Sequence, residues 1–255
     1  MKRKKYITLE LTNSMSTYGT LVRAFKDDEN NKYYFGDNDE IDYQTRKQYI
    51  PPLRDITRVK LESIDKIRIW MSSINTNDQV FTSLMLNVFR DYLEKITIVD
   101  VLRKCSEPRP MHTMVGCNTQ NELRECLKHE RKLCDSDINF YKKLLRYYGK
   151  RDESLKSFIM VKGTRISELK HSTFKRYILE TMNGYVRTPH LIGRIMSAEW
   201  DERGWIFGDN VIYKFIIDLI NEGKILINSS YFEQYSRSPI LHKKENWYVV
   251  WPKNN

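Results

Sequence analysis

The sequence lacks any long apolar run. No segment of its 255 residues approaches the roughly 18 consecutive apolar residues that a membrane-spanning helix needs. Residues 1–12 begin with basic side chains but contain no apolar core of a secretory signal peptide. We therefore expect a cytoplasmic protein without a membrane partner.

Cysteine, histidine and glycine do not form the spacings that mark common sites. The four cysteines, at positions 105, 117, 126 and 134, lack the short spacing of structural zinc ligands. The five histidines show no metal spacing either. There is no glycine-rich loop of the dinucleotide-binding or Walker type. The sequence therefore predicts no metal site and no bound cofactor.

Positive charge is in excess, and the excess lies in one segment. The chain has 43 Lys and Arg against 33 Asp and Glu, a net charge of +10. Residues 103–176 contain 18 basic and 9 acidic side chains, whereas residues 1–102 contain 16 and 15. Such a segment can bind the phosphates of a nucleic acid or of a phosphorylated small molecule. The same composition is also typical of a solvated helical surface.

Residues 1–104 have the pattern of a small α/β domain. We expect strands at residues 6–11, 32–35, 66–70 and 96–101. Before the last of these, Val80, Leu84, Val88 and Tyr92 recur every four residues, which predicts a helix with a wide buried face. A strand, helix and strand in this order predict parallel strands with a right-handed crossover. We therefore expect a Rossmann-like parallel α/β domain.

The pattern becomes helical in the second half of the chain. Residues 105–117, which contain two prolines, are expected to link the first domain to a helical domain over residues 118–255. The expected elements are helices at 121–129, 135–148 and 174–182, helices that start at Thr188 and Asp209, a stop at Gly223, and strands at 224–228 and 247–251.

The order of the last elements predicts a winged-helix-like unit over residues 187–255. Its final helix mixes Lys214 with Asp218 and Glu222, which favours packing or protein contact over DNA reading. We expect the C-terminal hairpin to be a surface for a protein partner.

Four short motifs resemble a bacterial family. They are residues 11–16, the strand IRIWMS at residues 67–72, the segment 144–158, and a C-terminal set that includes Gly208-Asp209 and Glu222-Gly223. In this order they resemble the proteins that pair domain of unknown function 1835 with domain of unknown function 3658. Asp152-Glu153 stands where the family has Glu-Asn, and Thr12-Asn13-Ser14 where it has Gly-Asp-Ser. The resemblance implies an architecture and no particular chemistry.

Polar residues follow two of the expected strands. Asn13, Ser14 and Ser16 follow the first strand, and Ser72 and Ser73 follow the strand at 66–70. Ligands of open α/β sheets bind at the carboxyl ends of the strands, where backbone N–H groups and hydroxyls can hold a phosphate. The alternative is ordinary helix capping by the same residue types.

A second candidate group lies in the basic segment. Arg151 and Lys156 could contact a phosphate or a carboxylate, with Asp152 and Glu153 beside them. Alternatively, the two acidic residues cap a helix and pair locally with their basic neighbours.

Two functions remain open from the sequence. The first is a binding or regulatory protein that recognises a phosphate-bearing ligand or a nucleic acid. The second is an enzyme that acts on a nucleotide or another phosphorylated substrate in a cleft between the domains. No motif for a catalytic nucleophile is recognisable, so the sequence does not decide whether the chain is an enzyme.

Overall fold

The chain divides into two compact units in a computed structural model. The first unit comprises Met1–Leu155 and Ile159–Ser167, and the second comprises Lys156–Phe158 and Glu168–Asn255. The structure describes residues 7–13, 15–28, 30–35, 61–104, 115–149, 157–182, 184–198, 207–227 and 248–250.

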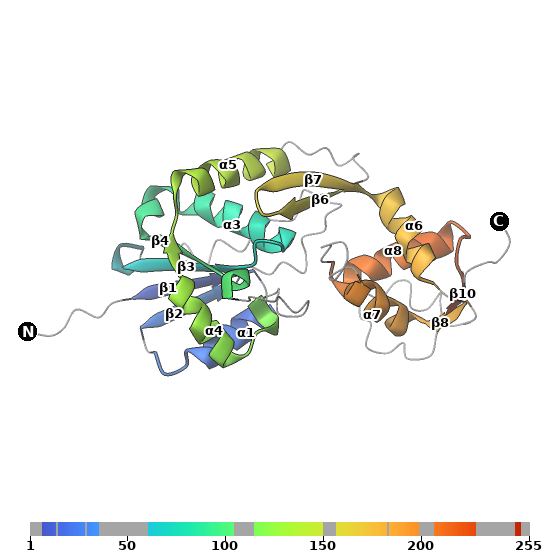
Figure 1. The fold of residues 1–255 in the computed structure, drawn as a ribbon, viewed down its shortest axis with the longest axis horizontal. Helices are drawn as coiled ribbons and strands as arrows, with labels where there is room; N and C mark the ends of the chain where they lie inside the picture. Colours follow the sequence, from blue (N-terminus) through green and yellow to red (C-terminus); the bar gives the residue numbers. More distant parts are fainter. Residues whose placement is uncertain are drawn as a thin grey trace, which may run out of the picture. The chain divides into compact units, whose positions relative to one another are not determined.

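The first unit is built on a five-stranded sheet (Figure 1). Its strands are β1 (Thr8–Thr12), β2 (Asn31–Phe35), β3 (Lys66–Met71), β4 (Ile96–Asp100) and β5 (Arg131–Lys132). They lie in the order β2-β1-β3-β4-β5. The first four are parallel, as the sequence predicted, and β5 pairs antiparallel with β4.

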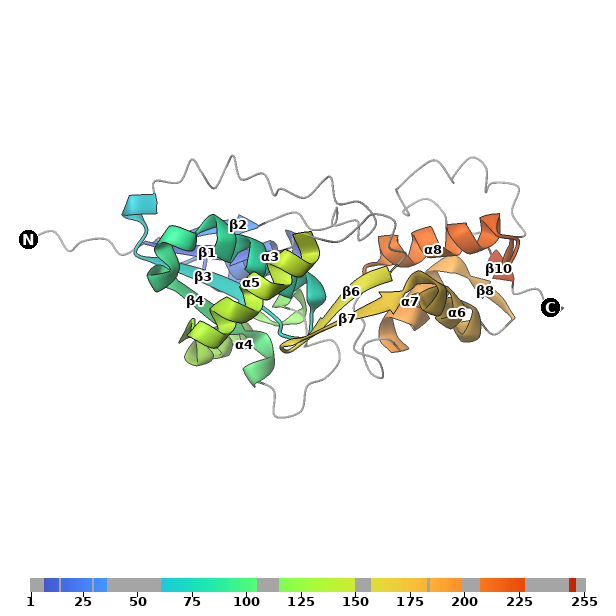
Figure 2. The same cartoon turned by 90° about the horizontal axis from the view of Figure 1, so that it is seen from above.

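Helices cover both faces of this sheet. They are α1 (Met15–Ala24), α3 (Thr76–Val88), α4 (Gln120–Cys126) and α5 (Asp135–Gly149). Ile67 and Ile69 of β3 pack in one core with α3 and α5, whereas Trp70 packs in another with α1 and α4. Successive strand residues face opposite sides, so burial of both faces explains the nearly continuous apolar strands. Helices α3 and α5 lie side by side (Figure 2).

Short 3₁₀ helices connect these elements. They are η1 (Leu61–Ser63), η2 (Arg90–Lys95), η3 (Val101–Lys104), η5 (Val115–Cys117) and η6 (Leu127–His129). The sequence predicted one helix that continues through Tyr92. Instead, α3 ends at Val88 and the 3₁₀ helix η2 follows, in which Tyr92 has non-helical backbone angles.

The first unit extends further along the chain than the domain expected at residues 1–104. Helices α4 and α5 and strand β5 belong to it, although the sequence analysis placed them in a helical domain from residue 118. Strand β5 pairs with β4. Tyr141 and Leu144 of α5 are buried in the same core as residues of α3. An amphipathic pattern shows which helix face is buried but not against which partner, so the sequence did not reveal this placement.

A hairpin belongs in part to each unit. Its strands are β6 (Ser157–Lys162) and β7 (Arg165–Lys170). Gly163 in the turn between them has a φ of 58°, a left-handed conformation that glycine adopts without steric cost. Ile159 and Val161 are buried in the core of the first unit, whereas Phe158 belongs to the second.

The second unit combines three helices with a small antiparallel sheet. Its elements are α6 (His171–Thr181), β8 (Tyr185–Arg187), α7 (Thr188–Ala198), α8 (Asp209–Asn221), β9 (Leu226–Ile227) and β10 (Tyr248–Val250). The strand order is β8-β10-β9. Its core contains the rings of Phe158, Phe174, Phe207 and Phe215, with centroids 4.6 to 5.6 Å apart. The architecture is thus an α/β sheet with parallel strands plus further helices.

Within these described ranges, no helix combines the length and the apolar character that crossing a membrane requires.

Candidate functional site

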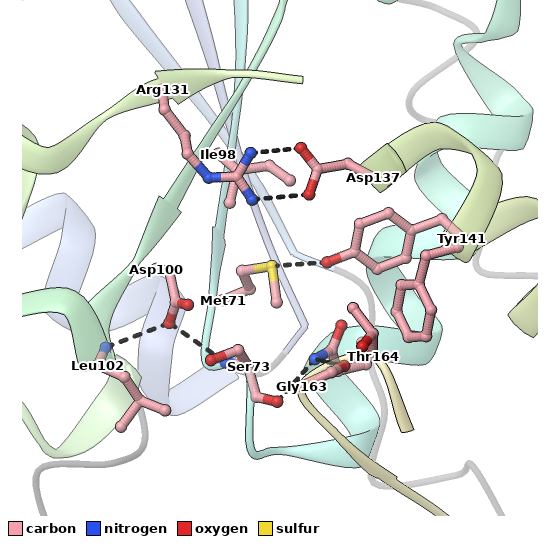
Figure 3. A pocket seen from close by; sticks show the side chains of 12 residues that line it. Met71, Ser73, Ile98, Asp100, Leu102, Arg131, Asp137, Tyr141, Gly163 and Thr164 are labelled. Atoms are coloured by element: carbon pink, nitrogen blue, oxygen red, sulfur yellow. Dashed lines mark hydrogen bonds and ion pairs between the residues drawn. The ribbon is translucent and has the colours of Figure 1, made fainter. Parts of the chain in front are cut away.

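Polar residues meet at one edge of the first unit's sheet. Asn13 follows β1, Ser72 and Ser73 follow β3, and Asp100 ends β4. This edge carries the carboxyl ends of the parallel strands, the usual ligand position in such sheets. Beside β3 and β4 lies a cavity of about 360 Å³ (Figure 3). Its lining residues are Met71, Ser73, Gln79, Ile98, Asp100, Leu102, Arg131, Asp137, Phe140, Tyr141, Gly163 and Thr164.

Asp78 is buried in the first turn of α3, next to this edge. Its Oδ2 accepts a hydrogen bond of 2.7 Å from the Ser72 backbone N–H, and its Oδ1 contacts the Asn13 side-chain amide. The Asn75 side chain caps the helix because it accepts hydrogen bonds from the backbone N–H groups of Asn77 and Asp78. Burial, together with a smaller contribution from the neighbouring Asp100 carboxyl, raises the pKa of Asp78 to about 8, although the hydrogen bond from the Ser72 N–H opposes this shift. Asn13 and Ser72 therefore hold a buried carboxyl group.

Asp100 has one carboxylate oxygen that remains available. Its Oδ1 accepts the backbone N–H groups of Ser73 and Leu102, each at 3.2 Å. Its Oδ2 accepts no hydrogen bond from the residues that the structure describes. The residue is only 8% exposed, yet it lines the cavity. Asp100 is thus a buried acceptor that a bound molecule could use.

Gln79 forms another part of the cavity wall. Its side-chain Nε2 donates to the backbone carbonyls of Ser73, at 2.7 Å, and Gly163, at 3.2 Å. These two acceptors fix which end of the amide carries the nitrogen. The other end, Oε1, is buried without a partner in the described part of the chain. Gln79 therefore joins α3 to the β6–β7 turn and leaves a second acceptor unused.

Helix α5 supplies the opposite wall. Arg131 pairs with both carboxylate oxygens of Asp137, one of them at 2.9 Å. Burial raises the pKa of Asp137, but hydrogen bonds from Arg131 and Cys134 outweigh it and bring the pKa to about 2. The Tyr141 hydroxyl donates to the Met71 sulfur at 3.2 Å, and burial raises the pKa of this phenol. The Arg131 charge is therefore already balanced within the wall.

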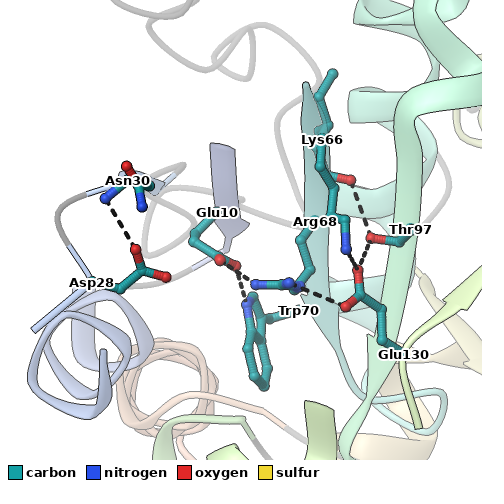
Figure 4. A network of polar contacts seen from close by, with 9 residues as sticks. Glu10, Asp28, Asn30, Lys66, Arg68, Trp70, Thr97 and Glu130 are labelled. Atoms are coloured by element: carbon teal, nitrogen blue, oxygen red, sulfur yellow. Dashed lines mark hydrogen bonds and ion pairs between the residues drawn. The ribbon is translucent and has the colours of Figure 1, made fainter. Parts of the chain in front are cut away.

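A second polar network crosses the sheet on its other face (Figure 4). Arg68 pairs with Glu10 and, at 3.1 Å, with Glu130. Trp70 Nε1 donates to Glu10 at 2.6 Å, and the Thr97 hydroxyl donates to Glu130 at 2.6 Å. Burial raises the pKa of Glu10 to about 6, although the charge of Arg68 opposes this shift. The network ties β1, β3 and β4 together and is mainly structural.

The structure places the residues expected from the sequence in different roles. Ser73 lines the cavity, while Asn13 and Ser72 hold Asp78. Ser16 lies in α1, but the structure does not describe its side chain. The remaining candidates lie outside the described residues: Ser14, Arg151, Asp152, Glu153 and Lys156.

Sequence reasoning missed Asp78, Gln79, Asp100 and Tyr141. A signal was present for Asp100, because an acidic residue that ends the apolar strand ITIVD must lie at the ligand-binding edge. Tyr141 gave no comparable signal, since its position on α5 reads as part of an ordinary buried helix face.

No group of three potential metal ligands lies close together within the described ranges. A comparison with known protein families found no family model that matches this chain. A comparison with curated proteins likewise found no matching sequence.

Proposed function

We propose that the chain is a binding protein of regulatory type that recognises a nucleotide or a similar phosphate-bearing ligand at the strand-end cavity. The observation that carries the proposal is the free Oδ2 of Asp100 in a cavity at the carboxyl ends of β3 and β4. The volume of about 360 Å³ is near the lower end of the range for small-molecule sites, about 300–1,000 Å³. It suits one small molecule rather than an extended chain.

The phosphate of such a ligand would lie outside the cavity. Among the described lining residues Arg131 is the cation, and it already pairs with Asp137. Ser14, Arg151 and Lys156, which lie outside the described residues, remain the phosphate contacts proposed from the sequence. A nucleic acid, bound through the basic segment 103–176, is the larger partner that the same chemistry would allow.

An enzyme that acts on a nucleotide is the alternative. It is favoured by Asp78, because a carboxyl group with a pKa of about 8 holds a proton at neutral pH and could donate it. Asp78 is buried and does not line the cavity, which favours binding over catalysis.

The proposal also includes a finer description of the fold. Four parallel strands in the order β2-β1-β3-β4, with helices on both faces, support a Rossmann-like first unit. Helices α6, α7 and α8 with the sheet β8-β10-β9 support a winged-helix-like end. Membership of the family that pairs domains of unknown function 1835 and 3658, a cytoplasmic location and a protein partner at the C-terminal hairpin remain part of the proposal.

Ligand screening by thermal unfolding tests the proposal. Nucleoside mono-, di- and triphosphates should raise the Tm, because a ligand at 100 times its Kd stabilises a protein by about 2.7 kcal/mol. Inorganic phosphate alone should have little effect. Calorimetry would then give the Kd, and product analysis would show whether any ligand is converted.

A variant that fills the cavity provides the matched test. Ser73→Phe should abolish the shift in Tm, whereas Ser172→Phe on the exposed side of α6 should preserve it. If no nucleotide raises the Tm of the unmodified chain, or if both variants respond equally, the proposal is wrong.

A further inference from the structure

The cavity has an unused hydrogen-bond acceptor and few unused donors. Asp100 Oδ2 has no partner among the described residues. The nearby donors are engaged: two backbone N–H groups bind Asp100 Oδ1, and the Gln79 amide nitrogen binds two carbonyls. A buried polar atom without a partner is costly, so the site favours a molecule that brings a donor.

Several of the remaining lining residues are apolar. Met71 and Ile98 come from the sheet, and Phe140 and Tyr141 come from α5. A flat ring can pack on such a lining. A saturated polar chain would leave these apolar side chains without matching contacts.

The Tyr141 hydroxyl adds a group that can change its partner. It donates to the Met71 thioether, which is a weak acceptor. A ring nitrogen or carbonyl of a ligand is a stronger acceptor and could replace the sulfur. The site thus offers a carboxylate acceptor and a phenol donor in a cavity that is lined in part by apolar side chains.

From this arrangement we infer that the cavity binds the base of a nucleoside or nucleotide, with an amino group of the base donating to Asp100 Oδ2. The inference rests on the proposed function and specifies which end of the ligand enters the cavity. The base packs on the apolar lining of the cavity, the amino group points to the end of β4, and the phosphate stays outside.

Pairs of nucleosides that differ in one amino group test the inference on the unmodified chain. The pairs are adenosine with purine riboside, guanosine with inosine, and cytidine with uridine. For at least one pair we expect the amino member to bind about 10- to 100-fold more tightly, because hydrogen bonds to charged groups have effects of this size. Calorimetry or competition against a fluorescent nucleotide gives both Kd values.

Asp100→Asn gives a sharper test. The new side chain keeps an oxygen for the N–H groups of Ser73 and Leu102 but places an NH₂ donor where Oδ2 was. We expect the preference for an amino group to be lost in the purine pairs, and to reverse for cytidine and uridine, because uridine has a carbonyl acceptor where cytidine has its amino group. Asp91→Asn, at an exposed position of η2, should leave the preference unchanged.

The outcomes separate this inference from the proposed function. Nucleotide binding with equal affinities within every pair, or an unchanged preference in Asp100→Asn, would overturn the inference and leave the proposed function intact. No binding of any nucleoside or nucleotide would overturn both. If Asp100→Asn does not fold, the comparison of pairs on the unmodified chain decides alone.

Discussion

The carboxyl groups of the first unit have pKa values that are shifted in opposite directions. Burial dominates for Asp78 and Glu10, whose pKa values rise to about 8 and about 6. For Glu130, burial also raises the pKa, but hydrogen bonds from Arg68 and Thr97 and the charge of Arg68 outweigh it and lower the pKa. Glu10 and Glu130 both pair with Arg68, but the Glu10 side chain is fully buried, whereas that of Glu130 is 17% exposed. The depth of burial therefore decides which of these two paired carboxyl groups has the raised pKa.

Asp78→Asn tests the effect of one of these groups on stability. A carboxyl group whose pKa is raised by folding stabilises the fold fully below its unfolded pKa, and this contribution is lost as the pH rises through its folded pKa. For Asp78 the window runs from the ordinary value of 3.8 to about 8. Relative to the variant, the unmodified chain should lose stability by up to about 1.4 kcal/mol per pH unit within that window.

Urea unfolding at several pH values between 5 and 8 measures this difference. The variant Asp91→Asn, on an exposed residue, is the control and should follow the unmodified chain. Equal pH dependence of the unmodified chain and Asp78→Asn would show that Asp78 does not hold a proton in the folded state.

At the residue scale, the sequence analysis named polar residues at one edge of the sheet, and the structure describes contacts for some of them. Ser73 lines the cavity at this edge. Asn13 and Ser72, which stay predicted ligand contacts, contact Asp78. Sequence spacing does not show which polar groups satisfy each other once they are buried, since those contacts depend on three strands and a helix.

At the element scale, periodicity and capping signals predicted most of the described elements. Strands β1, β3 and β4 and the starts of α7 and α8 follow the expected ranges closely. Strand β5 was missed, because two residues, Arg131 and Lys132, are too few to show an alternating pattern. Strand β7 was not expected either, since RISELK carries few strand-forming side chains.

The contact between Gln79 and the β6–β7 turn gives a prediction at this scale. Gln79→Leu removes the hydrogen bonds to the Ser73 and Gly163 carbonyls and leaves the Gly163 carbonyl short of a donor. We expect a loss of about 1–3 kcal/mol in stability, as for other buried hydrogen bonds of this kind. Hydrogen exchange should become faster in β6 and β7. In the unmodified chain, the Val161 backbone N–H of β6 donates to the Thr76 hydroxyl of α3.

Asn87→Leu is the matched control on the exposed side of the same helix. It should change neither the stability by more than about 0.5 kcal/mol nor the exchange of the hairpin. Unchanged exchange in Gln79→Leu would show that other contacts alone hold the turn against α3.

At the scale of the whole molecule, adjacent residues of β6 belong to hydrophobic cores of different units. Phe158 belongs to the aromatic core of the second unit, and Ile159 belongs to the core of the first. Neighbouring strand residues point to opposite sides, so one strand can serve both cores. The sequence analysis placed the linker at residues 105–117 because prolines there indicate a loop. The hairpin, in which the units divide at residue 158, gives no such signal.

Phe158→Ala and Ile159→Ala therefore form a matched pair. Phe158 is fully buried against three phenylalanine rings, and its truncation should cost about 3–5 kcal/mol, while truncation of Ile159 should cost about 2–5 kcal/mol. If each unit is stabilised by its own core, Phe158→Ala should speed hydrogen exchange in α6 and α8 and spare α3 and α5. Ile159→Ala should do the reverse, and Lys162→Ala, at an exposed position of β6, should do neither. Faster exchange in all four helices in both variants would instead mean that the chain unfolds as one cooperative whole.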